Sequence, residues 1–270
     1  MMSREADASR VNSVKKALRI LECFMTTSPE MTLTQLSREL NMPKSTLLNL
    51  IRTLEESGYV YRVRQSQSYR LGYKIMELGY SMRSAFPIVQ FALPLMEELQ
   101  SATGEFVYLT THIDNRVLYL ECVYPQKRTV GYSITGKTLP MHCTGCGKAM
   151  LSHMDEGEVR QIIDRWGLKR FTPNTITDPD RLREELALSR ERGYAIDNEE
   201  ETLGVRCVAT AIRNGQGRPV GAISIQGTTM SMTGERVVEY AALIASVSTI
   251  LSEHAHLFPA HQLSQGEVNC

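Results

Sequence analysis

Residues 31–72 carry the pattern that most constrains this chain, because two short helices, a tight turn and a β-hairpin are predicted there in immediate succession. Thr32 and Gln35 stand three residues apart at the start of an apolar run, which predicts a capping box at a helix start. A turn is predicted at 41–42. Pro43 suits the first position of the next helix, where its missing N–H would be unpaired anyway. This order predicts a winged helix-turn-helix, and hence a DNA-binding protein.

The second helix of the motif is predicted at 43–57 and ends at Gly58. Its apolar residues recur at the spacing of one buried helix face; they are Leu47, Leu50, Ile51 and Leu54. The residues expected to contact DNA lie on or beside the opposite face; they are Lys44, Ser45, Thr46, Leu48, Asn49 and Arg52. The Asn49 amide can pair with adenine, whereas Lys44 and Arg52 suit phosphate. The alternative is that these are ordinary solvated side chains of a small helical bundle.

A hairpin and a further helix complete the predicted DNA-binding domain. Segments 59–63 and 68–71 alternate in polarity around a polar turn, which predicts the wing of the motif. Three arginines lie on or beside it, and they either touch the DNA backbone or minor groove or stay solvated; they are Arg62, Arg64 and Arg70. Ahead of the motif, 13–27 predicts a helix with one buried face; that face is expected to hold Val14, Leu18, Leu21 and Met25.

The remainder of the chain predicts a helical linker at 73–103 and a mixed α/β domain at 104–270. The linker holds a short helix at 73–83 and a longer amphipathic one from Pro87. Strands are predicted at 105–113, 116–123, 129–134, 205–213 and 219–226. Helices are predicted at 147–153, 156–166, 180–192 and 233–254. The fold class is therefore α+β, with the winged helix-turn-helix domain at 1–72, and the linker helices are expected to transmit changes between the domains.

Charge and hydropathy favour a regulator that works on DNA in the cytoplasm. The whole chain is neutral, yet 1–72 holds 11 Lys and Arg against 7 Asp and Glu, and the rest holds 19 against 23. A basic module beside a mildly acidic one suits a nucleic-acid reader joined to another domain. No apolar run approaches the roughly 18 residues that span a bilayer, and 1–10 lacks the apolar core of a signal peptide. The six cysteines do not resemble a secreted disulfide framework.

Three stretches together match one family in its own order. They are KKALRILECF with LTQLSRELNMPKSTLLNLIRTLEESGYVYR, GKTLPMHCTGCGKAMLSHM, and RGYAIDNEEETLGVRCVATAIRNGQGRPVGAISIQG. Over nearly its whole length the chain resembles the IclR-type transcriptional regulators. The resemblance implies a winged helix-turn-helix joined to a GAF-like effector domain, acting as a homodimer or homotetramer on palindromic double-stranded operator DNA. It implies control of a catabolic operon by a small organic acid, repression more than activation, and no cofactor, enzyme activity or membrane partner.

The resemblance also implies where the effector binds. Matched residue by residue, the pocket is expected to hold Leu139, Gly145, Cys146, Asp197, Cys207, Ser224 and Gln226. Gly145 and Cys146 would open a helix whose free N–H groups favour an anion, and Gly145 would let a ligand approach the backbone. Ser224 and Gln226 alternate onto one face of a strand. Asp197 would repel a bare carboxylate, so it is expected to accept from a ligand hydroxyl, to be hydrogen-bonded or to have a shifted pKa.

Departures from the family pattern leave the ligand and the operator open. Leu48 and Asn49 stand where many relatives have His-Arg, so the operator sequence is expected to differ while the docking mode is kept. Cys146 stands where alanine or another small apolar residue is common, and Gln226 where close relatives carry serine. The longer amide adds polar atoms and narrows the cavity. A polyhydroxylated or substituted acid is therefore as good a candidate as a two- or three-carbon acid.

Two other functions compete with the effector site. A zinc-binding or thiol-responsive regulator would use the cysteines and the neighbouring histidine, namely His142, Cys143, Cys146 and Cys207, although only one CxxC pair is present. A cysteine-dependent enzyme would use Cys207 or Cys146 as nucleophile, His142 as base and Asp197 to orient it. The sequence offers no evident oxyanion site for such an enzyme beyond a helix terminus.

Overall fold

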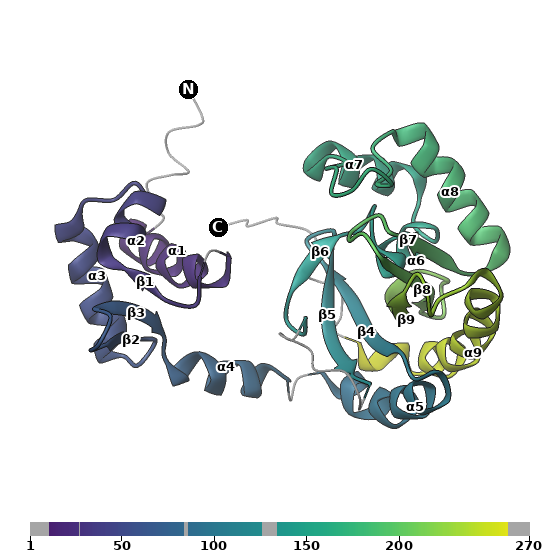
Figure 1. Ribbon diagram of the computed structural model, residues 1–270, viewed down its shortest axis with the longest axis horizontal. Coiled ribbons are helices and arrows are strands. Elements are labelled where there is room, and N and C mark those ends of the chain that lie inside the picture. Colours follow the sequence, from purple (N-terminus) through teal and green to yellow (C-terminus); the bar gives the residue numbers. More distant parts are fainter. Residues whose placement is uncertain (1–10, 27, 84–85, 126–133, 259–270) are drawn as a thin grey trace. The chain divides into compact units, whose positions relative to one another are not determined.

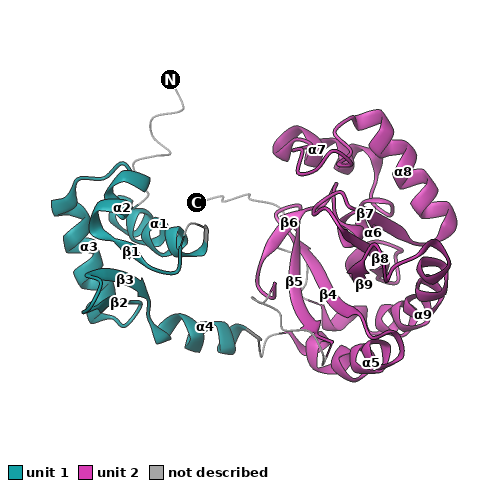
Figure 2. Ribbon diagram, in the orientation of Figure 1, with its two compact units in different colours: residues 1–85 teal, residues 86–270 magenta. Residues whose placement is uncertain are grey.

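The computed structural model describes residues 11–26, 28–83, 86–125 and 134–258. The chain divides into two compact units, residues 1–85 and 86–270 (Figure 2). The segment expected to link the domains is divided between them: its first helix belongs to the first unit and its second helix to the second.

The first unit is a winged helix-turn-helix. Its elements are α1 (Asn12–Thr26), β1 (Met31–Thr32), α2 (Leu33–Glu39), α3 (Lys44–Glu56), β2 (Val60–Val63), β3 (Ser68–Leu71) and α4 (Tyr73–Arg83). The hairpin β2–β3 lies where the sequence predicts it. The two-residue strand β1 was not predicted; it pairs antiparallel with β3 through Met31 and Tyr69, giving a sheet of order β1-β3-β2. The α+β fold class expected from the sequence is confirmed.

The predicted start of α2 is confirmed in detail. The Thr32 hydroxyl accepts from the Gln35 N–H at 3.3 Å, and the Gln35 side chain accepts from the Thr32 N–H at 2.7 Å. This reciprocal capping box satisfies two N–H groups that have no acceptor inside the helix. The helix α3 begins one residue later than predicted, at Lys44, so Pro43 is its N-cap and not its first helical residue, and Gly58 follows the helix with a positive φ of 78°.

The predicted buried face of α1 is wrong. Val14, Leu18 and Met25 are 54%, 53% and 71% exposed, and Leu21 is only half-buried. The core of the unit instead receives Ile20, Cys23 and Phe24. The helix carries two apolar stripes. Periodicity reveals both, but it does not say which one the rest of the unit covers.

The second unit is built on one antiparallel sheet. Its elements are α5 (Pro87–Thr103), β4 (Phe106–Ile113), β5 (Arg116–Val123), β6 (Thr138–Pro140), α6 (Gly145–Leu151), α7 (Glu156–Trp166), α8 (Pro179–Arg192), β7 (Ala195–Asn198), β8 (Val205–Arg213), β9 (Pro219–Thr228), α9 (Gly234–Glu253) and the 3₁₀ turn η1 (Ala255–Leu257). The strand order is β6-β5-β4-β9-β8-β7. The predicted strand at 129–134 lies outside the described residues except for Ile134, which is in no strand.

Helices cover both faces of this sheet (Figure 1). One face packs on α5 and α9, and its core includes Val107, Leu109, Ile223 and Ile225. The other face packs on α6, and α8 packs in turn on α6. Gly147 fits this second layer closely, because a Cβ added there would lie 2.2 Å from the Met141 carbonyl oxygen. Within the described ranges, no helix is long and apolar enough to cross a membrane.

Candidate functional site

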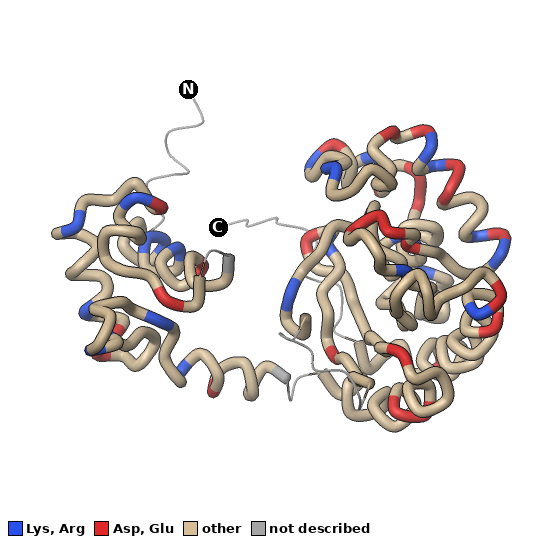
Figure 3. Tube along the Cα trace, viewed as in Figure 1, with Lys and Arg blue, Asp and Glu red and all other residues tan. Residues whose placement is uncertain are grey.

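The face of α3 predicted to read DNA is open to solvent. Leu47 and Ile51 are fully buried, while most of the predicted contact residues on the opposite side are exposed; these are Lys44, Ser45, Asn49 and Arg52. Thr46 and Leu48 are half-buried. Figure 3 shows where lysine and arginine lie along this unit. The helix therefore presents two cations and an amide, which suits phosphate contacts beside a base-edge contact.

The three wing arginines differ in their freedom. Arg70 lies 4.5 Å over the Tyr61 ring and 3.5 Å from the Glu30 carboxylate. Arg62 donates to the Gln67 side chain and lies 6.0 Å over the Tyr69 ring. Arg64 stands in the exposed turn between the strands. Contacts within the wing already occupy Arg70 and Arg62, so Arg64 is the arginine best placed to reach a DNA backbone.

Strand register brings the predicted effector residues together beneath α6. Asp197 pairs with Cys207, which pairs with Gln226; two residues along, Ala209 pairs with Ser224, which pairs with Tyr108. Alternate residues share a face, so these two adjacent rows point the same way. The rows lie under the start of α6, because a Cβ on Gly145 would be 3.0 Å from Cys207 Sγ and 3.6 Å from the Asp197 nitrogen.

Leu139 and the start of α6 border these rows. Leu139 lies on β6 opposite Val117 and packs, half-buried, against the same apolar cluster as Cys146. The α6 helix begins after Thr144, whose hydroxyl accepts from the Gly147 N–H at 3.2 Å. The helix has only seven residues, so its free N–H groups, and not a long helix dipole, would contact an anion.

This site is closed around its own side chains. Cys146, Cys207 and Ser224 are at most 4% exposed. Among the described residues the Ser224 hydroxyl has no nitrogen or oxygen partner, and only the weakly polar thiols of Cys146 and Cys207 lie beside it, which is costly for a buried hydroxyl. A groove of about 830 Å³ lies elsewhere, bordered by α7, the β8–β9 turn and the end of α9, and it contains none of the predicted effector residues. The convergence of polar groups, and not that open groove, makes this the candidate effector site.

Two tyrosines that sequence reasoning missed form its apolar wall. Tyr108 and Tyr119 are each 5% exposed, and their rings meet edge to face at 5.4 Å. The Gln226 amide donates to the Tyr108 hydroxyl at 3.4 Å. The alternation of β4 and β5 would have placed both rings on the Ser224 face, once the pairing of β4 with β9 was known.

Asp197 is the titratable centre of the site. Burial, with a smaller contribution from the nearby Glu200 carboxylate, raises the pKa of its carboxyl to about 7. The Glu200 N–H donates to Asp197 Oδ1 at 2.8 Å and the Lys148 ammonium lies nearby, and both act to lower the pKa. Because burial dominates, Asp197 changes its charge close to neutral pH.

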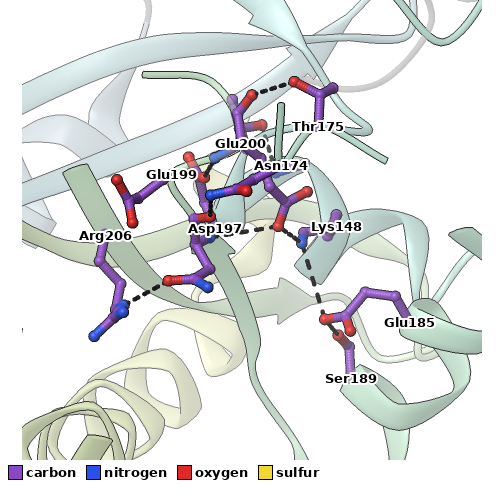
Figure 4. Close-up of polar contacts among 12 residues, drawn as sticks. Lys148, Asn174, Thr175, Glu185, Ser189, Asp197, Glu199, Glu200 and Arg206 are labelled. Atoms are coloured by element: carbon purple, nitrogen blue, oxygen red, sulfur yellow. Dashed lines mark hydrogen bonds and ion pairs between the residues drawn. The ribbon is translucent and has the colours of Figure 1, made fainter. Parts of the chain in front are cut away.

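A buried ion pair behind Asp197 was also missed. Lys148 on α6 is 1% exposed, and its ammonium pairs with the Glu200 carboxylate (Figure 4). It also lies 3.9 Å from Glu185 on α8, which in turn pairs with Arg192 at 2.7 Å. Burial raises the pKa of Glu200 while Lys148 opposes that rise. A lysine in a helix is usually a surface residue, so nothing in the sequence signalled this burial.

The geometry does not support a metal or thiol site. The His142 Nε2 atom lies 3.0 Å from the Lys169 carbonyl oxygen, and burial lowers the pKa of His142. Burial raises the pKa of Cys146 and Cys207, which disfavours the thiolate that would bind a metal or attack a substrate. Within the described ranges, no three His, Cys, Asp or Glu side chains are grouped to hold a metal ion.

The fold and these sites define a helix-turn-helix transcriptional regulator with an effector-type α/β domain. Two family models match: the IclR helix-turn-helix domain over residues 13–64 and the bacterial transcriptional regulator IclR C-terminal domain over residues 81–253. The chain belongs to the IclR family of bacterial transcriptional regulators. Its homologues are regulators and not enzymes, and they give no support to a metal-responsive mode of action.

Named relatives agree with this assignment. The chain is 31% identical to the Escherichia coli HTH-type transcriptional regulator XynR over 90% of its own length and 96% of the relative's. It is 32% identical to the Salmonella typhimurium acetate operon repressor, over 87% of this chain and 86% of that one. The crystal structure of the Thermotoga maritima IclR is similar with a TM-score of 0.73 and 30% identity, covering 91% of this chain and 99% of that one.

The burial of Asp197 predicts how stability depends on pH. Its pKa is raised from 3.8 to about 7 in the folded protein, so between these values the folded state binds more protons than the unfolded state. The contribution of Asp197 to the free energy of unfolding should therefore fall as pH rises from about 4 to about 7 and stay constant above that. Asp197→Asn, which does not titrate, should gain stability relative to the wild type across this window. Urea unfolding at several pH values measures the difference.

The exposed Asp164 on α7 provides the matched control. Asp164→Asn, which removes an exposed carboxyl outside the site, should keep a constant stability difference from the wild type at every pH. If the difference in free energy of unfolding between the wild type and Asp197→Asn does not change between about pH 4 and pH 7, the pKa assigned to Asp197 is wrong.

Proposed function

We propose that this regulator reads a palindromic operator with the exposed face of α3 and releases it when a small organic acid occupies the site beneath α6. The observation that carries the proposal is the open face of α3, where Lys44, Asn49 and Arg52 are exposed on a helix whose Leu47 and Ile51 are fully buried. Because DNA in bacteria lies in the cytoplasm, we place its action there. The relative named as an operon repressor supports repression of a catabolic operon.

Three features support an organic acid as the effector. Among the described residues the buried Ser224 hydroxyl has only thiols beside it, the Gly145 backbone is close to Asp197, and the Gln226 amide reaches the same face of the sheet. An acid with a hydroxyl or oxo group would satisfy these polar atoms while its apolar part packs on the two tyrosines. None of the predicted effector residues carries a positive charge, so side-chain hydrogen bonds and backbone N–H groups would hold the acid.

An exposed apolar stripe on α1 supports a homodimer. Val11, Val14, Leu18 and Met25 are each more than half exposed and recur at intervals of three, four and seven residues. With Leu21 this is the spacing of a helix that packs on a second helix. A second copy of this chain is the partner that a palindromic operator requires, since two-fold DNA symmetry is matched by two-fold protein symmetry. We propose that α1 pairs with α1 of a second chain, leaving two α3 helices to address two half-sites.

Replacing Asn49 separates base reading from backbone binding. Asn49→Ala should lose about 1–3 kcal/mol of preference for the operator over scrambled DNA. Lys44→Ala should weaken binding to both DNAs alike and lower the slope of log affinity against log salt by about 1. Fluorescence anisotropy with DNA from the gene's own promoter region, at several salt concentrations, measures both. Arg160→Ala, on the exposed side of α7, is the control that should change neither. Equal loss on both DNAs for Asn49→Ala would refute base reading by this residue.

A charge on the α1 stripe should split the dimer. Leu18→Asp buries a carboxylate in the proposed contact, so sedimentation velocity should show a monomer and operator affinity should fall at least tenfold, since paired half-site binding is lost. Ser13→Asp adds the same charge on an exposed position of α1 outside the stripe and should leave the assembly unchanged. A Leu18→Asp protein that sediments like the wild type would rule out this contact.

Removing the Ser224 hydroxyl should remove the response to the effector. With Ser224→Ala, pyruvate, lactate or 4-hydroxybenzoate should no longer release operator DNA, while operator affinity without the acid stays unchanged. Thr210→Ala is the matched control, because its buried hydroxyl also lacks a partner but its position alternates away from the Ser224 face. Anisotropy of labelled operator during titration with each acid is the measurement. If Ser224→Ala responds as the wild type does, the site lies elsewhere.

A further inference from the structure

The proposed effector site holds more buried carboxylates than buried cations. Asp197 on β7 and Glu200 in the following loop are each 5% exposed, and Lys148 on α6 pairs its ammonium with the Glu200 carboxylate (Figure 4). Its hydrogen bond goes to Glu200 and its next neighbour is Glu185. Glu185 is neutralised separately by Arg192. With Asp197 ionised, the buried group formed by Asp197, Glu200 and Lys148 therefore carries one uncompensated negative charge.

None of the other groups that face Asp197 supplies a positive charge. From the β7–β8 loop, Glu200 and Glu201 both raise the pKa of Asp197. The remaining neighbours are a phenol on β5 and thiols on α6, on the segment before it and on β8; they are Tyr119, Cys146, Cys143 and Cys207. Burial raises the pKa of all four, so they stay neutral. Arg206 on β8 donates instead to the Asn198 side chain and the Met232 carbonyl oxygen.

A carboxylate effector would bring a second negative charge next to this buried group. Two like charges in a buried site raise each other's pKa, so one of them takes up a proton. Asp197 is placed to hold that proton. Its Oδ1 accepts the Glu200 N–H at 2.8 Å, whereas Oδ2 has no hydrogen bond to any described residue. A protonated Oδ2 can donate to a ligand carboxylate, and an ionised one can only repel it.

We propose that the site binds its effector as a monocarboxylate together with one proton, with Asp197 as the neutral hydrogen-bond donor to the ligand carboxylate. The proposal rests on the effector site proposed above and deepens it by naming the ligand's charge. The proton comes from solvent and stays between Asp197 Oδ2 and the ligand oxygen, and no covalent bond forms. A dicarboxylate is disfavoured because its second charge finds no cation within the described site.

Calorimetry on the full-length protein tests this directly. Pyruvate, lactate and 4-hydroxybenzoate are titrated at about pH 6, 7 and 8, each in PIPES or HEPES and in Tris, which differ in their ionisation enthalpies. The heat difference between buffers gives the protons taken up per acid bound. We expect uptake to approach one proton at about pH 8, and affinity to fall by up to tenfold per pH unit above about pH 7. Lactamide, the uncharged analogue of lactate, should bind without proton uptake.

Variants assign the proton to Asp197. Asp197→Asn keeps a hydrogen-bond donor that does not titrate, so it should bind the same acid with no proton uptake and no pH dependence. Asp164→Asn should keep wild-type uptake and wild-type pH dependence. Circular dichroism establishes that each variant is folded, and the wild-type buffer comparison stands even if Asp197→Asn does not fold.

Different outcomes of these experiments would refute the proton-coupled binding mode and the effector site. Saturable binding with no proton uptake at about pH 8 and a pH-independent affinity would overturn the proton-coupled mode while leaving the effector site in place. If Asp197→Asn still takes up a proton, another group holds that proton, and the role proposed for Asp197 is overturned while the effector site again stays in place. If none of the acids gives saturable binding at any pH, the effector site itself is refuted and this inference with it.

Discussion

The second unit depends on a buried charged contact between α6 and the loop after β7. Lys148 and Glu200 leave water together, and such a pair stabilises a fold only weakly compared with apolar residues of the same size. Its structural effect is positional. With Lys148 holding its carboxylate, Glu200 turns its own N–H toward Asp197, and the hydroxyls of Thr172 and Thr175 fix its carbonyl oxygen. One ion pair thereby orients the Glu200 N–H toward Asp197, the residue proposed to face the effector.

The regular elements were predictable because their signals are local. The capping box of α2, the turn chemistry of the wing and the alternation of β8 and β9 each depend on a few adjacent residues. The strands that were missed are β1, β6 and β7, with two to four residues each. Such short strands gain their hydrogen bonds from a partner far away in the sequence, so they carry little pattern of their own.

The candidate site was predictable only in part, for a related reason. Gly145, Asp197 and Ser224 came from the family resemblance, and register then places them together. Tyr119 and Lys148 came from neither source, since their burial is created by packing between α6 and the sheet. The prediction of the buried face of α1 was wrong for a similar reason. Periodicity marks every apolar stripe, but it does not distinguish a stripe that the same chain covers from a stripe that stays exposed.

The close contact of Gly147 with the Met141 carbonyl oxygen restricts which part of the effector domain can yield. Without a Cβ in between, α6 rests on the backbone that leads into it, so helix and leading segment behave mechanically as one block. The opposite rim, from Asn198 to Gly204, is anchored mainly by side chains and includes several exposed residues. A ligand entering the proposed site would therefore meet α6 as one stiff wall, while the opposite rim, which follows Asp197 on β7 and bears Glu200, is held chiefly through side chains.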